Sequence, residues 1–366
     1  MTKSLFLFAI ACILYNSIII AQTDKDKAQE LLKEGIQLMD NGAIDESIEI
    51  LKKGTKLYPD RIDFPYEIAY ANYLKKEYKK AIKILEKLTD HKDVSDYIYQ
   101  LLGNSYDYIK KPEKALETYQ KGMKKFPKSG KFYLESGVIE ALRKNYNEAI
   151  VFWEQGIKVE PNYPSNYYQL SKLFSNTDEK LWTLLYGEIF MNLEAGSKRT
   201  SEISKLLYDT YQESYEVLTD SSGQFNITKK GFEIIITDKK DMKDLKKGIL
   251  PFAGTYASAY AFAGINFHSG IDIKSIYNAR KSFLDFWFEQ KKFHKQYPNK
   301  ILSFQKEIQK EEIFEAYTYW LISEGNPEEF EKWYKESPEK FEKFATWFKS
   351  TSIDIKEKDL YSRRDY

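Results

Sequence analysis

The sequence predicts an all-α protein in which a solenoid of helix pairs is followed by a helical C-terminal domain. Small and bulky residues recur at a spacing of 34 residues through the first half of the chain. A period of this length is typical of stacked helix pairs, because one pair cannot bury its apolar face alone. Only ten prolines occur among 366 residues, so few positions forbid a helix.

Four columns of residues stay in phase through the repeat, and proline closes three of the units. The columns are Gly35, Ala69, Gly103 and Gly137; Ser47, Ala81, Ala115 and Ala149; Leu51, Leu85, Tyr119 and Trp153; and Gly54, Leu88, Gly122 and Gly156, with the prolines at Pro59, Pro127 and Pro161. Small residues let two helix axes approach to about 8–10 Å. We therefore expect the first two columns to face each other at a helix crossing, and the bulky third column to fill the gap to the next unit.

The best match to a known motif lies in the third unit. It is Tyr99-x-x-Leu102-Gly103-x-x-Tyr106, followed by Ala115, Tyr119, Gly122 and Pro127. This pattern resembles the tetratricopeptide repeat (TPR). The resemblance implies a right-handed solenoid over residues 28–195, with four clear repeats and a degenerate fifth. The fifth departs from the pattern because Thr183 and Gly187 stand where an alanine and an aromatic residue are usual. An ordinary helical bundle with accidental spacing is the alternative.

Residues 1–21 are predicted to be a signal peptide. Lys3 precedes an apolar run from Leu5 to Tyr15, and a polar stretch follows a plausible cleavage point after Ala21. An uncleaved anchor and a lipoprotein signal at Cys12 are alternatives, although the chain stays apolar after Cys12. We expect export to the periplasm or outer-membrane periphery of a Gram-negative bacterium. The segment 182–208 also resembles exported repeat proteins of Bacteroidetes-type bacteria, which implies no particular activity.

The charge and cysteine content of the mature chain exclude several kinds of partner and chemistry. Cleavage after Ala21 would leave 55 basic residues, 55 acidic residues and no cysteine. A nucleic-acid partner would favour a basic balance, so none is expected. Disulfides, thiol nucleophiles and cysteine metal sites are excluded. No stretch after residue 21 reaches the roughly 18 apolar residues of a membrane span, so we expect no transmembrane segment in the mature chain.

The resemblance implies that the first helix of each repeat lines a concave groove and that ligands lie there. The residues at the corresponding offsets are Tyr66, Tyr70, Tyr73, Tyr97, Gln100, Asn104, Asp107, Tyr108, Lys131, Leu134, Tyr168 and Lys172. Tyrosine combines apolar area with a polar tip at low entropic cost, which suits a surface for a peptide. Packing of the same rings against the next repeat or the C-terminal half is the alternative. Lys131 and Lys172 are too few for a clamp that captures a C-terminal carboxylate.

The second half is predicted to begin with a connecting helix over 196–220 and a linker over 220–231. A short strand over 232–237 is possible. The small residues of 254–264 indicate tight helix packing, with a hinge or ligand-facing helix as the alternative. Helices are expected over 272–297 and 301–323 within a helical domain of residues 232–350, and a loose tail over 351–366.

A short motif occurs twice near the C-terminus, beginning at Asn326-Pro327 and at Ser337-Pro338. A capping residue followed by proline at the first helical position predicts two short helices. Their aromatic faces hold Phe330, Trp333, Tyr334, Phe341, Phe344, Trp347 and Phe348. These rings indicate either core packing or an exposed patch for a partner or a glycan.

No residue pattern indicates catalysis, a cofactor or a metal. The three histidines, His91, His268 and His294, lack a metal-binding spacing, and no phosphate loop, dinucleotide fingerprint or nucleophile elbow is present. His268 with Asp272 is the one pair that could act as an acid and a base. The sequence therefore predicts a non-enzymatic scaffold that binds a protein or peptide partner in the cell envelope. An envelope enzyme or glycan-binding protein, with its site in residues 232–366, is the alternative.

Overall fold

The computed structural model describes residues 25–219, 222–225, 252–262, 271–290, 293–356, 359 and 363. Most of these residues are helical, which confirms the predicted all-α fold. The chain divides into two compact units, one ending at Pro127 and the other beginning at Lys128. The predicted signal peptide over 1–21 lies outside the described residues. No described helix has the length and apolar character that crossing a membrane requires.

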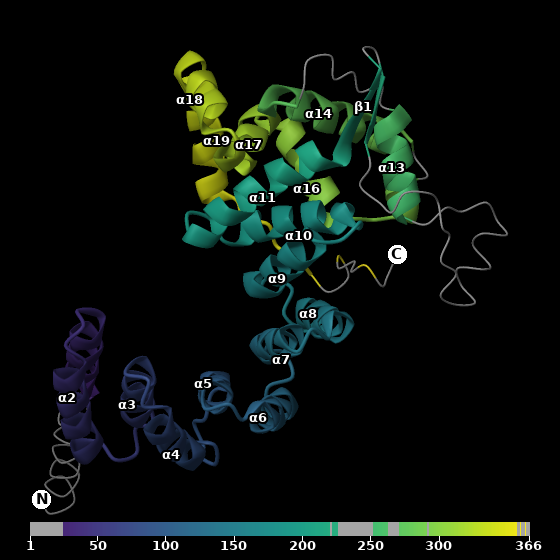
Figure 1. Ribbon diagram of the computed structural model, residues 1–366. Coiled ribbons are helices and arrows are strands. Elements are labelled where there is room, and N and C mark those ends of the chain that lie inside the picture. The colour runs from purple at the N-terminus through teal and green to yellow at the C-terminus, as the bar shows by residue number, and fades with distance from the viewer. Residues whose placement is uncertain are drawn as a thin grey trace, which may run out of the picture. The chain divides into compact units, whose positions relative to one another are not determined.

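In the first unit, each helix packs against the next one along the chain (Figure 1). After a helix over 25–40 come α2 (Ile44–Leu57), α3 (Asp63–Leu74), α4 (Tyr78–Leu88), α5 (Asp96–Tyr108) and α6 (Pro112–Lys125). Charged side chains stabilise both ends of α2. Asp45 and Glu46 lie in its first turn and Lys56 lies in its last, where they complement the helix dipole. Leu51 and Phe64 are fully buried in the core shared by α2 and α3.

The turn between the two helices of a repeat has the same backbone form four times. One residue per repeat has a positive φ, at Gly42 (82°), Lys76 (61°), Lys110 (62°) and Lys144 (66°), again spaced by 34. At the third turn the amide of Lys110 donates to the carbonyl of Asp107 at 2.8 Å, and that of Lys111 donates to the carbonyl of Tyr106 at 3.0 Å. These paired bonds satisfy carbonyls that the end of a helix leaves open.

Glycine in the first helix of a repeat accommodates the bulky residue of the second helix. A Cβ atom on Gly103 would lie 2.1 Å from Tyr119 Cε1, and one on Gly137 would lie 2.3 Å from Trp153 Nε1. The bulky column therefore lies over the glycine of its own repeat, and the prediction that it fills the gap to the next repeat was wrong. A glycine in the second helix provides room for the next repeat, since Gly54 faces Phe64.

The second unit begins with two further repeats. Their helices are α7 (Lys131–Leu142), α8 (Tyr146–Val159), α9 (Pro164–Phe174) and α10 (Lys180–Leu193), and α11 (Lys198–Ser214) packs after them. Gly187 replaces the bulky residue in α10, and a Cβ atom there would lie 2.8 Å from Leu207 Cδ2. Leu207 of α11 thus lies where the fifth repeat lacks its own large side chain. The departure at Gly187 makes room for a capping helix.

The connecting helix ends earlier than predicted. It stops at Ser214, and β1 (Tyr215–Thr219) pairs with β2 (Ser222–Phe225) as an antiparallel hairpin, with Tyr215 opposite Phe225. The predictions of helix to residue 220 and of an irregular linker from residue 220 were wrong here, because valine, threonine and tyrosine favour strands. The possible strand over 232–237 lies outside the described residues.

The C-terminal part is helical, as predicted. It comprises α13 (Phe252–Phe262), α14 (Ile273–Glu289), α15 (Phe293–Gln296), α16 (Lys300–Lys310), α17 (Phe314–Leu321), the 3-10 turn η1 (Ser323–Gly325), α18 (Pro327–Glu336) and α19 (Pro338–Ser350). The helix expected over 301–323 breaks at Glu312, whose φ is 60°. Asn326 caps α18 by accepting from the amide of Glu329 at 3.3 Å, whereas Ser337 makes no such bond at α19.

One core joins repeats four and five to the C-terminal helices. It extends from Leu134 to Ile355 and includes Trp287 and Tyr317, which are fully buried. Inside it, Arg280 Nη2 of α14 donates to Glu188 Oε1 of α10 at 2.6 Å. This division of the chain differs from the expected one, in which a solenoid over 28–195 precedes a separate domain over 232–350.

The described segment after α19, residues 351–356, corrects the first part of the prediction of a loose tail over 351–366. Ile353 and Ile355 are buried, and Asn162 bonds to the backbone of Ile355. Two apolar side chains two residues apart point to the same side of an extended chain, so the segment can pack without forming a helix.

Candidate functional site

The most exposed aromatic residues of the first unit lie on α3, α5 and the start of α4. Together with the half-buried Tyr66, Tyr73 and Tyr78 on the same elements they form what we call the tyrosine face: Tyr66, Tyr70, Tyr73, Tyr78, Tyr97 and Tyr108. Tyr97 and Tyr108 are each 56% exposed and Tyr70 is 37% exposed. On α3 the tyrosines follow at i, i+4 and i+7, which places their side chains on one side of the helix.

The rings at one end of the tyrosine face contact each other. Tyr78 and Tyr108 are stacked with centroids 4.8 Å apart, and Tyr73 meets both edge-on at 5.4 and 5.5 Å. Aromatic pairs prefer these stacked and T-shaped arrangements. The contacts restrict the rotation of these surface side chains, and an ordered surface loses less entropy on binding.

Tyr78 was not among the residues predicted to line the groove. It is the first residue of α4, which is the second helix of its repeat, so an offset rule for first helices could not identify it. The sequence did contain a signal for it: Tyr78 is an aromatic residue that comes just after the turn at the end of α3. Because α4 begins where α3 ends, that ring can reach the face formed by the first helices.

Tyr66, at the other end of the tyrosine face, is the member whose phenol is affected by burial. Desolvation, followed by the nearby charge of Glu67, raises the pKa of the Tyr66 phenol. Tyr66 is therefore a neutral hydrogen-bond donor throughout the physiological range.

The polar residues predicted beside the tyrosines are on α5 and half-buried: Gln100, Asn104 and Asp107. Asn104 Oδ1 accepts a hydrogen bond of 2.5 Å from the hydroxyl of Tyr119. That bond fixes the orientation of the Asn104 amide relative to the second helix of its repeat. The first unit thus brings eight of the predicted residues onto α3 and α5.

In the second unit, three predicted groove residues are buried: Lys131, Leu134 and Tyr168. The carbonyl of Leu134 accepts from Trp153 Nε1 at 3.1 Å, so it belongs to the contact between α7 and α8. Tyr168 is covered by α11. These positions do not line an open groove, which corrects the prediction for repeats four and five.

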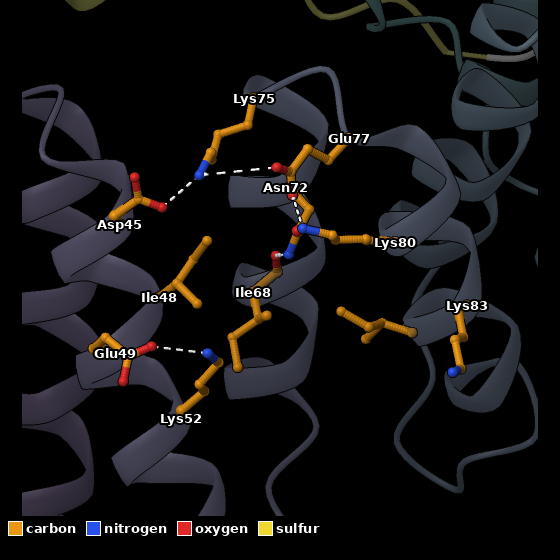
Figure 2. Close-up of a pocket in the computed structure, with 11 residues that line it drawn as sticks. Asp45, Ile48, Glu49, Lys52, Ile68, Asn72, Lys75, Glu77, Lys80 and Lys83 are labelled. Carbon is orange, nitrogen blue, oxygen red and sulfur yellow. Dashed lines mark hydrogen bonds and ion pairs between the residues drawn. The ribbon is translucent and has the colours of Figure 1, made fainter.

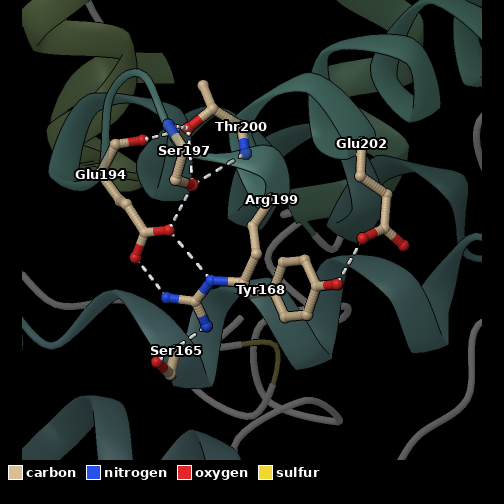
Figure 3. A network of polar contacts seen from close by, with 7 residues as sticks. All are labelled: Ser165, Tyr168, Glu194, Ser197, Arg199, Thr200 and Glu202. Carbon is tan, nitrogen blue, oxygen red and sulfur yellow. Dashed lines mark hydrogen bonds and ion pairs between the residues drawn. The ribbon is translucent and has the colours of Figure 1, made fainter. Parts of the chain in front are cut away.

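A polar network holds α11 over Tyr168 (Figure 3). The Tyr168 hydroxyl donates to Glu202, and Lys172 pairs with the same carboxylate at 2.6 Å. The guanidinium of Arg199 lies 5.0 Å from the centre of the Tyr168 ring and bonds to both oxygens of Glu194. Burial raises the pKa of Glu202, but hydrogen bonds from Lys172 and Tyr168 lower it by more, so the pKa of this carboxyl is held below its ordinary value. Lys172 is thus engaged within the chain.

A cleft of about 410 Å³ opens between α2, α3 and α4 (Figure 2). Ile48, Ile68 and Ile84 contribute apolar side chains to it, and four lysines are among its lining residues: Lys52, Lys75, Lys80 and Lys83. Sequence reasoning missed this group because its members come from three helices.

Carboxylates compensate three of the cleft lysines. Lys75 pairs with Asp45 and lies 4.0 Å from Glu77, and Lys80 pairs with Glu77 at 2.6 Å. Lys52 pairs with Glu49 at 2.8 Å. The cleft therefore has mixed charge and is not an anion-binding clamp.

The C-terminal aromatic faces mostly form core contacts. Trp333 and Phe344 are buried, and the rings partly buried against the same core are Phe330, Phe341, Trp347 and Phe348. Tyr334 is exposed. The small-residue segment also packs tightly where it is described, since Ala259 is fully buried and Tyr260 stacks on Phe283 at 4.2 Å.

The described residues contain no group of three acidic, histidine or cysteine side chains that could hold a metal. Asp272 caps α14 through a bond of 2.7 Å from the amide of Ser275, while His268 lies outside the described residues. The pair that could act as acid and base is therefore not tested.

No protein-family model and no curated protein matches this chain. The chain is similar to tetratricopeptide-repeat proteins of known structure. A thermophilic TPR protein of Thermus thermophilus is 17% identical over 49% of this chain and 98% of its own, with a TM-score of 0.42. The Pseudomonas aeruginosa pilF protein is 14% identical over 52% and 85%, with a TM-score of 0.43. MamA of Desulfovibrio magneticus RS-1 is 16% identical over 47% and 98%, with a TM-score of 0.36.

Proposed function

We propose that this chain is an exported scaffold that binds an extended segment of a protein partner on the tyrosine face. The observation that carries the proposal is the group of surface tyrosines on α3, α4 and α5, in which the rings of Tyr73, Tyr78 and Tyr108 pack against one another. Tyr70, Tyr97 and Tyr108 are exposed. A group of exposed aromatic residues is a common sign of an interaction surface.

The chemistry of the face fits a peptide. Phenol rings provide broad apolar area with few rotatable bonds, and their hydroxyls can bond to a backbone in any register. Tyr66 remains a neutral donor because burial raises its pKa. The six residues that make up the tyrosine face are themselves uncharged, so a free carboxylate is not the expected anchor. We expect aromatic and aliphatic side chains of the partner to insert between the rings.

The proposed location is the cell envelope, and the support for it is the predicted signal peptide over residues 1–21. A partner in the periplasm or at the outer membrane would meet the exported chain there. N-terminal sequencing of the secreted or periplasmic protein tests this part separately. An N-terminus at Gln22 supports it, and an intact Met1 on a cytoplasmic protein would contradict it.

Site-specific photocrosslinking tests the binding surface. A photoreactive phenylalanine analogue replaces Tyr97 in the full chain, and the matched control carries it at Tyr334, which is exposed in the second unit. We expect one discrete crosslinked species from position 97 and none of that mass from position 334. Equal crosslinking at both positions would indicate random encounter and would contradict the proposal.

A further inference from the structure

The last described residues of the chain bind along repeats four and five. From residue 352 to residue 356 exposed and buried side chains alternate, with Ile353 4% and Ile355 3% exposed. Alternation with a period of two indicates an extended chain with one side against the protein. The segment thus contacts the surface through two β-branched side chains and its backbone.

A single side chain recognises the backbone of this segment. Asn162, in the loop before α9, accepts from the amide of Ile355 at 3.0 Å through Oδ1. Its Nδ2 donates to the carbonyl of the same residue at 3.4 Å and to Asp354 Oδ1 at 3.3 Å. An amide that pairs with both backbone groups of one residue holds an extended chain whatever its sequence, so the isoleucine side chains must provide the selectivity.

A second anchor holds Arg363 against the same repeats. Its amide donates to the Tyr186 hydroxyl at 3.0 Å, and its guanidinium lies 5.5 Å from the centre of the Phe174 ring. The guanidinium also lies 3.5 Å from Glu179 and 4.0 Å from Glu154, a carboxylate that is 1% exposed. A buried carboxylate is costly without a nearby cation, so these repeats favour an arginine at this place.

We propose that this surface is a second peptide site, which takes an extended Ile-x-Ile segment followed by an arginine, and that the chain's own C-terminal segment occupies it. The described contacts come from α8, α10, the end of α9 and the loops at residues 162 and 179, whereas the tyrosine face belongs to α3, α4 and α5. The two sites therefore share no residue. A partner with the same pattern must displace the C-terminal segment, whose tether gives it a high effective concentration.

A labelled peptide with the sequence of residues 350–366 tests the site by fluorescence anisotropy on the full chain. The variant Ile353→Asp/Ile355→Asp should release the tethered segment, and the control Ser352→Asp/Lys356→Asp places the same two aspartates on exposed positions. We expect the released variant to bind the peptide at least about tenfold more tightly than the intact chain and the control. Adding Asn162→Ala to the released variant should weaken binding by about tenfold, because two backbone hydrogen bonds are lost.

Equal peptide binding by the intact and released chains, or no effect of Asn162→Ala in the released variant, would overturn the proposal. Hydrogen exchange provides a second test that does not require the released variant to fold. In the intact chain Asn162→Ala should raise exchange in residues 351–356 by about tenfold, with α18 unchanged. Unchanged exchange in that segment would also overturn the proposal.

Discussion

The ring of Tyr108 is stacked on the ring of Tyr78, with centroids 4.8 Å apart. Tyr78 begins the second helix of one repeat, whereas Tyr108 ends the first helix of the next. The stacked pair therefore joins two repeats at the surface. Tyr73 contacts both rings and extends the pair into the tyrosine face.

The lysines with positive φ should be suboptimal for stability. A left-handed conformation costs an L-residue roughly 1–2 kcal/mol, and glycine avoids this at an entropic cost of roughly 0.5–1 kcal/mol. We expect Lys76→Gly and Lys110→Gly each to raise the free energy of unfolding by about 0.5–1 kcal/mol, measured by urea denaturation. Lys83→Gly, in the interior of α4, is the control and should lower it by about 1 kcal/mol. A loss at Lys76 or Lys110 would contradict this account of the turn.

Substitutions at Gly103 and Tyr119 should have non-additive effects on the free energy of unfolding. Gly103→Ala places a Cβ atom 2.1 Å from Tyr119 Cε1, and overpacking of this kind costs typically about 1–3 kcal/mol. Tyr119→Leu in the same chain should recover part of that loss by making room. A double-mutant cycle in urea measures the coupling. Additive effects would show that the ring does not limit the space at Gly103.

The buried ion pair of Glu188 and Arg280 should be sensitive to the loss of one member. Arg280 is 1% exposed and bonds to Glu188 at 2.6 Å, so Arg280→Met leaves a buried carboxylate, at a cost of about 3–5 kcal/mol. The double variant Glu188→Leu/Arg280→Met should be less destabilised than Arg280→Met alone. The midpoint of urea denaturation measures the stability of both variants.

The control for the buried pair is Lys205→Met. It breaks the exposed pair of Lys205 with Asp209 and should change the free energy of unfolding by less than about 1 kcal/mol. If Arg280→Met were as mild as this control, Glu188 and Arg280 would not depend on each other in the core.

Acid should loosen the contact between α9 and α11. The pKa of Glu202 is held below its ordinary value, because the hydrogen bonds from Lys172 and Tyr168 outweigh the effect of burial. A lowered folded pKa gives stability that is present above the unfolded value and lost as the pH falls through the folded one. We expect the melting temperature to fall less steeply on acidification in Glu202→Gln than in the parent chain. Glu336→Gln, at an exposed position, is the control and should leave the slope unchanged.

The repeat could be predicted from the sequence because its determinants are local and periodic. Gly103 and Tyr119 recur in register with their counterparts, and the spacing alone identifies the helix pair. The partner of the bulky residue could not be read from that spacing. A ring four positions after a small residue can turn toward either neighbouring helix, and only the packed structure shows that it lies over the glycine of its own repeat.

The site was predicted in part for a related reason. Offsets along a first helix identify Tyr70 and Tyr108, but they do not tell which repeats another helix covers. Tyr168 occupies an equivalent offset, yet Arg199 and Glu202 of α11 lie over it. The recognition of Ile355 by Asn162 joins distant parts of the chain, which no periodic pattern reveals.

Partner affinity of a tyrosine-face variant tests the central claim most directly. Once photocrosslinking has identified the partner, its affinity is measured for the parent chain and for Tyr70→Ala/Tyr73→Ala/Tyr108→Ala. The control Leu142→Ala/Tyr146→Ala/Tyr334→Ala removes three exposed side chains from the second unit. Binding to the first variant should weaken at least about a hundredfold, since truncating central aromatic residues costs about 2 kcal/mol or more each. Unchanged affinity, with an unchanged circular dichroism spectrum, would contradict the claim that the tyrosine face binds the partner.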